Sequence, residues 1–157
     1  MLRILTLCHG NICRSPLAEV LIEAAVAADP LLAGHVVVSS AGTSDEHAGE
    51  GMHTNSAAIL SALGLRSIHQ TRLFTTTMAA TLDLVLAADQ VNLRNGRAII
   101  RMADTQPEIR LLRDFDPTAT GRDLDDPWGY PPAEYERTAA EISAAIPGLL
   151  AELRDRL

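Results

Sequence analysis

The 157-residue chain contains no lysine, and all thirteen of its basic residues are arginine. Schiff-base chemistry requires a lysine amine and is therefore excluded. The phosphate loop of nucleoside triphosphatases, which contains a lysine, is excluded for the same reason. Any phosphate that the chain binds must be held by arginine side chains and backbone amides.

The chain also lacks long apolar runs, an excess of positive charge and widely spaced cysteines. No apolar run approaches membrane-spanning length, and the net charge of −7 argues against a general nucleic-acid binder. Both cysteines, Cys8 and Cys13, lie in one short segment, whereas secreted disulfide scaffolds distribute cysteines through the fold. The histidines show no metal-ligand spacing. We therefore expect a cytoplasmic protein with reactive thiols, no metal, no nucleic-acid partner and no membrane association.

Short apolar runs alternate with segments of helical periodicity. We expect strands over residues 2–7, 36–40, 82–88 and 108–111. We expect helices over residues 16–28, 55–63, 75–80, 90–95 and 133–156, with caps at Ser15, Thr54 and Asp89 and a disturbance at Pro147. This alternation predicts one α/β domain over residues 1–157, with a four-stranded parallel sheet and helices on both faces. Cys8, Ser40 and Asp89 should then lie at the carboxyl edge of the sheet, where ligands bind.

Residues 8–16 join the first predicted strand to the first predicted helix. A tight loop at this point can aim its backbone N–H groups at one anion, and the helix N-terminus adds partial positive charge. Cys8 at the head of the loop is expected to ionise and act as a nucleophile. Arg14 can hold two phosphoryl oxygens, Gly10 allows close approach of the backbone, and Asn11 tolerates left-handed geometry. The loop therefore predicts attack on a phosphate ester.

The pattern Cys-x-Gly-Asn-Ile-Cys-Arg-Ser-Pro-x-Ala-Glu after an N-terminal strand resembles the low-molecular-weight protein tyrosine phosphatase family. Further segments resemble landmarks of that family: residues 39–43, His69 with Arg72, residues 83–86 with Asp89, and Asp126-Pro127-Trp128. The resemblance implies hydrolysis of phosphotyrosine proteins and small aryl phosphates, without a cofactor. It implies a phosphocysteine intermediate, with phosphate as a product.

The resemblance also implies roles for individual residues. Cys8 would be the nucleophile, Arg14 the phosphate ligand, and Asp126 the general acid and then the base. Among the neighbouring aspartates, Asp125 is the alternative candidate for the acid. The phosphate-binding loop would contain His9, Gly10, Asn11, Ile12, Cys13 and Ser15. A supporting network would contain Asn11, Ser15, Ser40 and His69.

Glu46, Trp128 and Tyr130 are expected to form the cleft wall. Several family members have an aromatic residue where this chain has Glu46. The resemblance further suggests that Cys13 pairs with Cys8 on oxidation, which makes the enzyme redox-sensitive. Tyr135 is expected to be structural, and Arg110 and Arg113 are expected to be surface charges.

Three alternatives remain open. Protein arginine phosphatases resemble this chain but carry threonine at the position of Ile12, where a branched apolar residue favours tyrosine. An arsenate reductase would have to depend on an external small thiol, because no cysteine follows Cys13. A non-enzymatic phosphate-binding module would require a disabled site, whereas Cys8, Arg14 and Asp126 are all present.

Overall fold

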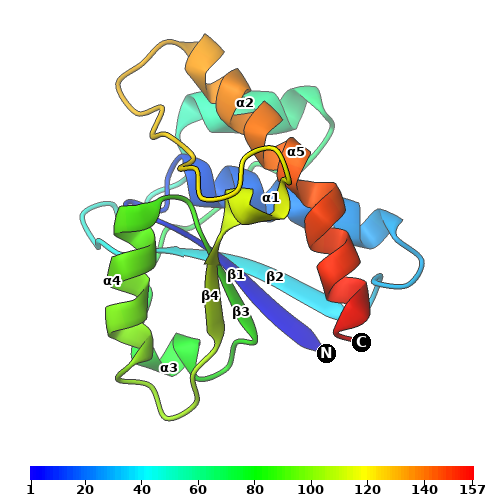
Figure 1. Cartoon of the computed structure of the whole chain (residues 1–157). Helices are drawn as coiled ribbons and strands as arrows, with labels where there is room; N and C mark the ends of the chain where they lie inside the picture. The colour runs from blue at the N-terminus through cyan, green and yellow to red at the C-terminus, as the bar shows by residue number, and fades with distance from the viewer.

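Four parallel strands form one sheet in the computed structural model, which describes residues 1–157 (Figure 1). They are β1 (Leu2–Cys8), β2 (Val36–Gly42), β3 (Leu84–Ala87) and β4 (Glu108–Leu111), in the order β2-β1-β3-β4. The progression of strands reverses between β1 and β3, and ligands of parallel sheets bind beyond such a switch point. The predicted sheet is confirmed, and Cys8 lies at this point because it is the last residue of β1.

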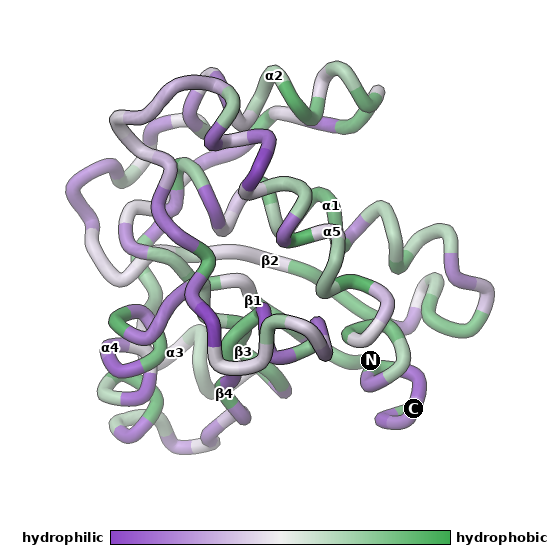
Figure 2. Tube along the Cα trace, turned by 45° about the horizontal axis from the view of Figure 1, so that its top comes forward, coloured by the Kyte–Doolittle hydropathy of each residue, from purple (hydrophilic) through white to green (hydrophobic).

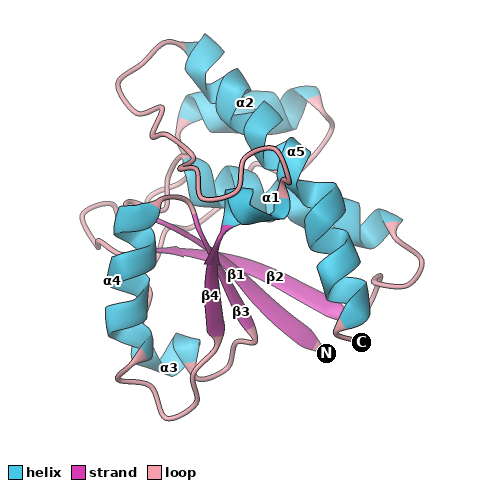
Figure 3. Cartoon of the chain, viewed as in Figure 1, coloured by secondary structure: helices cyan, strands magenta, loops and turns pink.

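Helices cover both faces of this sheet (Figure 3). They are α1 (Arg14–Ala28), α2 (Thr54–Ala62), α3 (Thr76–Ala79), α4 (Gln90–Ile100) and α5 (Pro132–Asp155), together with a 3₁₀ helix, η1 (Leu112–Phe115). Helices α1 and α5 pack on one face, with α2 outside them, and α3 and α4 lie on the other face (Figure 1). No helix combines the length and apolar character needed to cross a bilayer.

The side chains of β1 alternate between two hydrophobic cores, as expected for a strand covered on both faces. Ile4 and Cys8 belong to the larger core, beneath α1 and α5. Leu5 and Leu7 belong to the smaller core, with Phe74. Helix α4 alternates between hydrophilic and hydrophobic colours in Figure 2, as expected of a helix with one face against the sheet. This packing fixes the end of β1, where the candidate nucleophile lies.

Two predicted helix caps are wrong. Helix α1 begins at Arg14, one residue before the predicted cap, and has no side-chain cap. The Ser15 hydroxyl contacts Cys8 and Asn11 instead. Helix α2 is capped by His53 and not by Thr54. The Nδ1 of His53 accepts a hydrogen bond from Asn55 N at 3.1 Å.

The predicted cap at Asp89 is confirmed, because its Oδ1 accepts from Asn92 N at 2.8 Å. The helix that it caps extends five residues beyond the predicted end, to Ile100. Helix α5 continues through Pro147. The glycine that follows allows α5 to approach η1, since a Cβ on Gly148 would lie 2.0 Å from Phe115 O. The Pro-Gly pair therefore marks a close contact between elements and not a break in the helix.

Candidate active site

A cavity of about 400 Å³ opens beyond the carboxyl end of β1. It is lined by the loop after β1 and by two distant segments of the chain. The lining residues are Cys8, His9, Gly10, Ile12, Cys13, Arg14, Glu46, His47, Asp126 and Trp128. The fold thus brings the candidate nucleophile, phosphate ligand and acid to one place, although more than a hundred residues separate Cys8 from Asp126 in sequence.

The loop after β1 presents a thiol and a series of free donors. Cys8 is buried, and its Sγ lies 3.0 Å from the Ser15 hydroxyl, which can donate to a thiolate. The backbone N–H groups of residues 9–13 donate to no backbone carbonyl of the protein. Because backbone donors are seldom left without partners, a run of them beside a thiol is suited to an anion with several oxygens.

Asn11 holds the loop in shape. Its φ of 57° is the one positive φ of a non-glycine residue in the chain. Its Nδ2 donates to Ser15 Oγ at 2.8 Å and to Ser40 Oγ at 3.0 Å, and its Oδ1 accepts from Arg72 N at 3.0 Å. The end of β2 packs so closely on the loop that a Cβ on Gly42 would lie 2.6 Å from the nearest backbone oxygen.

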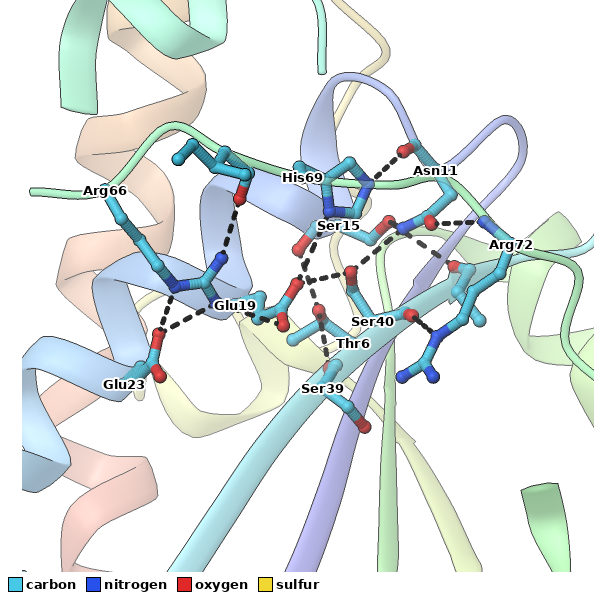
Figure 4. A network of polar contacts seen from close by, with 12 residues as sticks. Thr6, Asn11, Ser15, Glu19, Glu23, Ser39, Ser40, Arg66, His69 and Arg72 are labelled. Carbon is cyan, nitrogen blue, oxygen red and sulfur yellow. Dashed lines mark hydrogen bonds and ion pairs between the residues drawn. The ribbon is translucent and has the colours of Figure 1, made fainter. Parts of the chain in front are cut away.

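A partly buried carboxylate, Glu19, extends this network toward Arg66, as Figure 4 shows. Ser40 Oγ donates to Glu19 Oε2 at 2.5 Å, and Glu19 Oε1 lies 3.2 Å from Arg66 Nη2. His69 Nε2 donates to Asn11 O at 2.8 Å, and burial lowers the pKa of His69 below its ordinary value. The structure therefore brings all four predicted network residues together. It adds Glu19, which the sequence signals only as a carboxylate one helical turn after Ser15.

Arg14 lies beneath the cavity with one edge of its guanidinium occupied. Its Nη1 donates to Asp89 Oδ2 and to Leu124 O, both at 2.7 Å. Its Nε and Nη2 make no hydrogen bond, so this edge can grip two oxygens of a bound phosphate. Burial opposes the charge, but Cys8, Asp89 and Asp126 raise the pKa of Arg14 above its ordinary value. The guanidinium is therefore held charged and in a fixed orientation.

Asp126 lies at the mouth of the cavity. Its side chain is 51% exposed, and its Oδ2 is 3.8 Å from Arg14 Nη2. Its Oδ1 accepts from Trp128 N at 3.1 Å, a turn that directs the carboxylate toward the loop after β1. Asp125 does not line this cavity; it lines a neighbouring hollow that also contains Tyr130. The geometry therefore favours Asp126 over Asp125 as the acid, and Tyr130 stands outside the catalytic cavity.

The part of the cavity wall that Glu46 and His47 contribute is polar. Glu46 Oε1 lies 3.0 Å from His9 Nε2, and His47 Nδ1 lies 2.5 Å from Glu50 Oε2. A Cβ on Gly10 would lie 3.1 Å from the His47 ring, so the wall packs directly on the phosphate loop. The structure thus places Glu46 and Trp128 around the cavity, as the sequence predicts.

The second cysteine is in a different environment from the first. Both thiols are free and buried. Cys13 Sγ lies 3.6 Å from the Tyr135 hydroxyl, and the Tyr135 ring stacks on His53 at 4.8 Å. Burial raises the pKa of the Cys13 thiol to about 12. Cys13 is therefore protonated at neutral pH and is not a competing nucleophile.

Comparison with known proteins agrees with the family resemblance seen in the sequence. The family model described as "Low molecular weight phosphotyrosine protein phosphatase" matches residues 3–157. A low molecular weight protein-tyrosine-phosphatase of Streptomyces coelicolor is 39% identical, over 99% of this chain and 95% of its own length.

Two solved structures share the fold. A protein tyrosine phosphatase from Entamoeba histolytica has a TM-score of 0.87 at 22% identity, covering 99% of this chain and 98% of its own. A drosophila arginine phosphatase has a TM-score of 0.88 at 22% identity, covering 96% of each chain. The same fold thus occurs in a tyrosine phosphatase and in an arginine phosphatase. The chain belongs to the low-molecular-weight phosphotyrosine protein phosphatase family.

Proposed function

We propose that this protein hydrolyses phosphotyrosine in proteins, and small aryl phosphates, through a phosphocysteine intermediate. One juxtaposition carries the proposal: Cys8, a run of free backbone donors, the unoccupied edge of Arg14 and Asp126 surround a single cavity. These groups match what phosphoryl transfer to a thiol requires, namely a nucleophile, charge neutralisation and a proton for the leaving oxygen.

In the first step, the Cys8 thiolate attacks phosphorus and an S–P bond forms. The P–O bond to the phenol breaks, and Asp126 protonates the departing oxygen. The N–H groups of residues 9–13 and the free edge of Arg14 stabilise the three equatorial oxygens. In the second step, water attacks phosphorus while the Asp126 carboxylate takes its proton. The S–P bond breaks, and inorganic phosphate and the thiolate are released.

The apolar parts of the cavity support a phosphotyrosine substrate. Ile12 lines the cavity beside the phosphate loop, and Trp128 lines its mouth with 59% of its surface exposed. Both can pack against an aromatic ring that enters between them. A phosphoarginine side chain has no ring to fill this space, so tyrosine is the substrate that the lining favours.

The two cysteines support a redox-sensitive enzyme. Both thiols are unpaired, and both line the same cavity. Oxidation of the Cys8 thiolate by a peroxide would give a sulfenic acid, and the Cys13 sulfur would then displace hydroxide from it, forming a disulfide and water and protecting the nucleophile from irreversible oxidation. Membership of the family and the two free thiols also support a cytoplasmic location.

The test is a comparison of turnover on phosphotyrosine, phosphoarginine and phosphoserine peptides of one sequence, without added metal. The proposal predicts that phosphotyrosine is hydrolysed fastest and that Cys8→Ser abolishes turnover. Cys13→Ser is the matched control and should keep most of the activity. Faster turnover of phosphoarginine would replace the proposed substrate, and oxidation of an external thiol by arsenate would indicate a reductase.

A further inference from the structure

Three successive backbone carbonyls, immediately before Asp126, each accept a hydrogen bond from a different arginine. Arg113 Nη1 donates to Asp123 O at 3.0 Å, Arg14 Nη1 donates to Leu124 O at 2.7 Å, and Arg137 Nη2 donates to Asp125 O at 3.4 Å. The three arginines belong to η1, α1 and α5. The loop drawn in yellow to orange in Figure 1 is therefore fixed from three sides just before the candidate acid.

Arg113 and Arg137 share one carboxylate, that of Glu141. Glu141 Oε2 lies 2.9 Å from Arg137 Nη1 and 3.7 Å from Arg113 Nη1. Glu134 Oε2 also accepts from Arg137 Nε, at 2.8 Å. Arg113 is mostly buried, with 16% of its side chain exposed, and is not the surface charge expected from the sequence. Carboxylates of α5 thus orient both of the guanidinium groups that contact the loop.

The last of these contacts is the one that bears on Asp126. Asp123 and Leu124 have further anchors, because Gln90 N donates to Asp123 Oδ1 at 2.9 Å and Leu124 N donates to Ala88 O at 2.8 Å. Asp125 makes no hydrogen bond except the one from Arg137. Asp126 itself is half exposed; its only hydrogen bond is the turn within its own loop, and its only ion pair is the 3.8 Å contact with Arg14.

We propose that Arg137, oriented by Glu134 and Glu141, is a positioning residue that holds the backbone at Asp125 so that the Asp126 carboxyl group reaches the leaving oxygen. This inference rests on the proposed function, in which Asp126 is the acid. Proton donation depends steeply on geometry, and a displacement of about 1 Å can cost roughly 100-fold in rate. Loss of this anchor should therefore impair protonation of the leaving group more than attack by Cys8.

The experiment compares kcat/KM of Arg137→Gln on phenyl phosphate, whose leaving group needs protonation, and on 2,4-dinitrophenyl phosphate, whose leaving group does not. We expect a decrease of about tenfold on phenyl phosphate, since general acid catalysis contributes about 100-fold or more, and little change on the activated ester. Asp126→Asn is the positive control and should show the same selectivity to a greater degree. Arg154→Gln removes another ion-paired arginine of α5, bound to Asp29 at the far end of the helix, and should change neither rate.

Glu141→Gln provides a second variant, because it weakens the hold on Arg137 without removing the guanidinium. We expect the same selectivity to a smaller degree. Circular dichroism and the urea midpoint identify any variant that fails to fold. Equal losses on the two esters, in the folded variants, would overturn the inference while leaving the proposed function intact. If the wild-type enzyme hydrolysed neither ester, the proposed function itself would be refuted.

Discussion

Asn11 is the residue whose replacement tests the architecture of the phosphate loop most sharply. It is completely buried and combines a positive φ with three side-chain hydrogen bonds, two donated to Ser15 and Ser40 and one accepted from Arg72 N. Asn11→Ala removes the hydrogen bonds and places a Cβ in left-handed backbone without a polar side chain. Asn11→Gly removes the same hydrogen bonds but is free to adopt this φ.

The two variants separate a side-chain contribution from a backbone contribution. At ~1 kcal/mol for each hydrogen bond, loss of the side chain should cost ~3 kcal/mol in both variants. The left-handed conformation should cost Asn11→Ala ~1 kcal/mol more. Because Ser15 and the loop donors lose their support, kcat/KM should fall by about 100-fold or more in both.

Urea unfolding gives the free energies, and hydrolysis of p-nitrophenyl phosphate gives kcat/KM. We expect Asn11→Ala to be less stable than Asn11→Gly and both to be less stable than the wild type. A stability within about 0.5 kcal/mol of the wild type for either variant would refute the account of the hydrogen bonds. A more stable Asn11→Ala than Asn11→Gly would refute the account of the backbone.

Three further predictions concern titration and specificity. Burial raises the pKa of Cys13 to about 12, so its contribution to stability is present below about pH 9 and is lost between about pH 9 and 12. Cys13→Ala should therefore reduce the slope of the unfolding free energy in that interval. Burial lowers the pKa of His69, so its contribution is present above about pH 6.5 and is lost on acidification. His69→Gln should flatten the stability profile below pH 6.5, and NMR of the ring should show titration at a pH lower than in the unfolded chain. Glu46→Gln should raise kcat/KM up to about fivefold for a phosphotyrosine peptide with flanking acidic residues, by removing an exposed like charge, and should change little for a neutral peptide.

Much of the site could be predicted from the sequence because its determinants are local. Strand, loop and helix follow one another from Leu2 to Ala28, and Cys8, Arg14 and Ser15 have positions set by that succession. The left-handed conformation of Asn11 was likewise predictable from its residue type. The parallel sheet then brought Cys8, Ser40 and Asp89 to one edge.

Features that depend on distant contacts could not be predicted in this way. Ser15 suits a helix cap, but a buried thiol and amide compete for its hydroxyl, and the helix begins earlier. Arg113 was expected to be a surface charge and nothing in the sequence singles out Arg137; only the course of the loop before Asp126 shows that both hold its carbonyls. Tyr130 is close to Trp128 in sequence, yet the turn between them directs it into a different hollow.

The most direct test of the mechanism is to trap the covalent intermediate. Asp126→Asn slows the attack of water, so phosphoenzyme should accumulate during turnover of an activated aryl phosphate. Rapid quenching then preserves this intermediate for analysis. Trypsin would release residues 4–14, which contain both cysteines, and fragmentation by mass spectrometry would locate the added phosphoryl group. We expect the phosphoryl group on Cys8, with Cys13 unmodified. A phosphoryl group on Cys13, or on any residue outside this peptide, would contradict the mechanism.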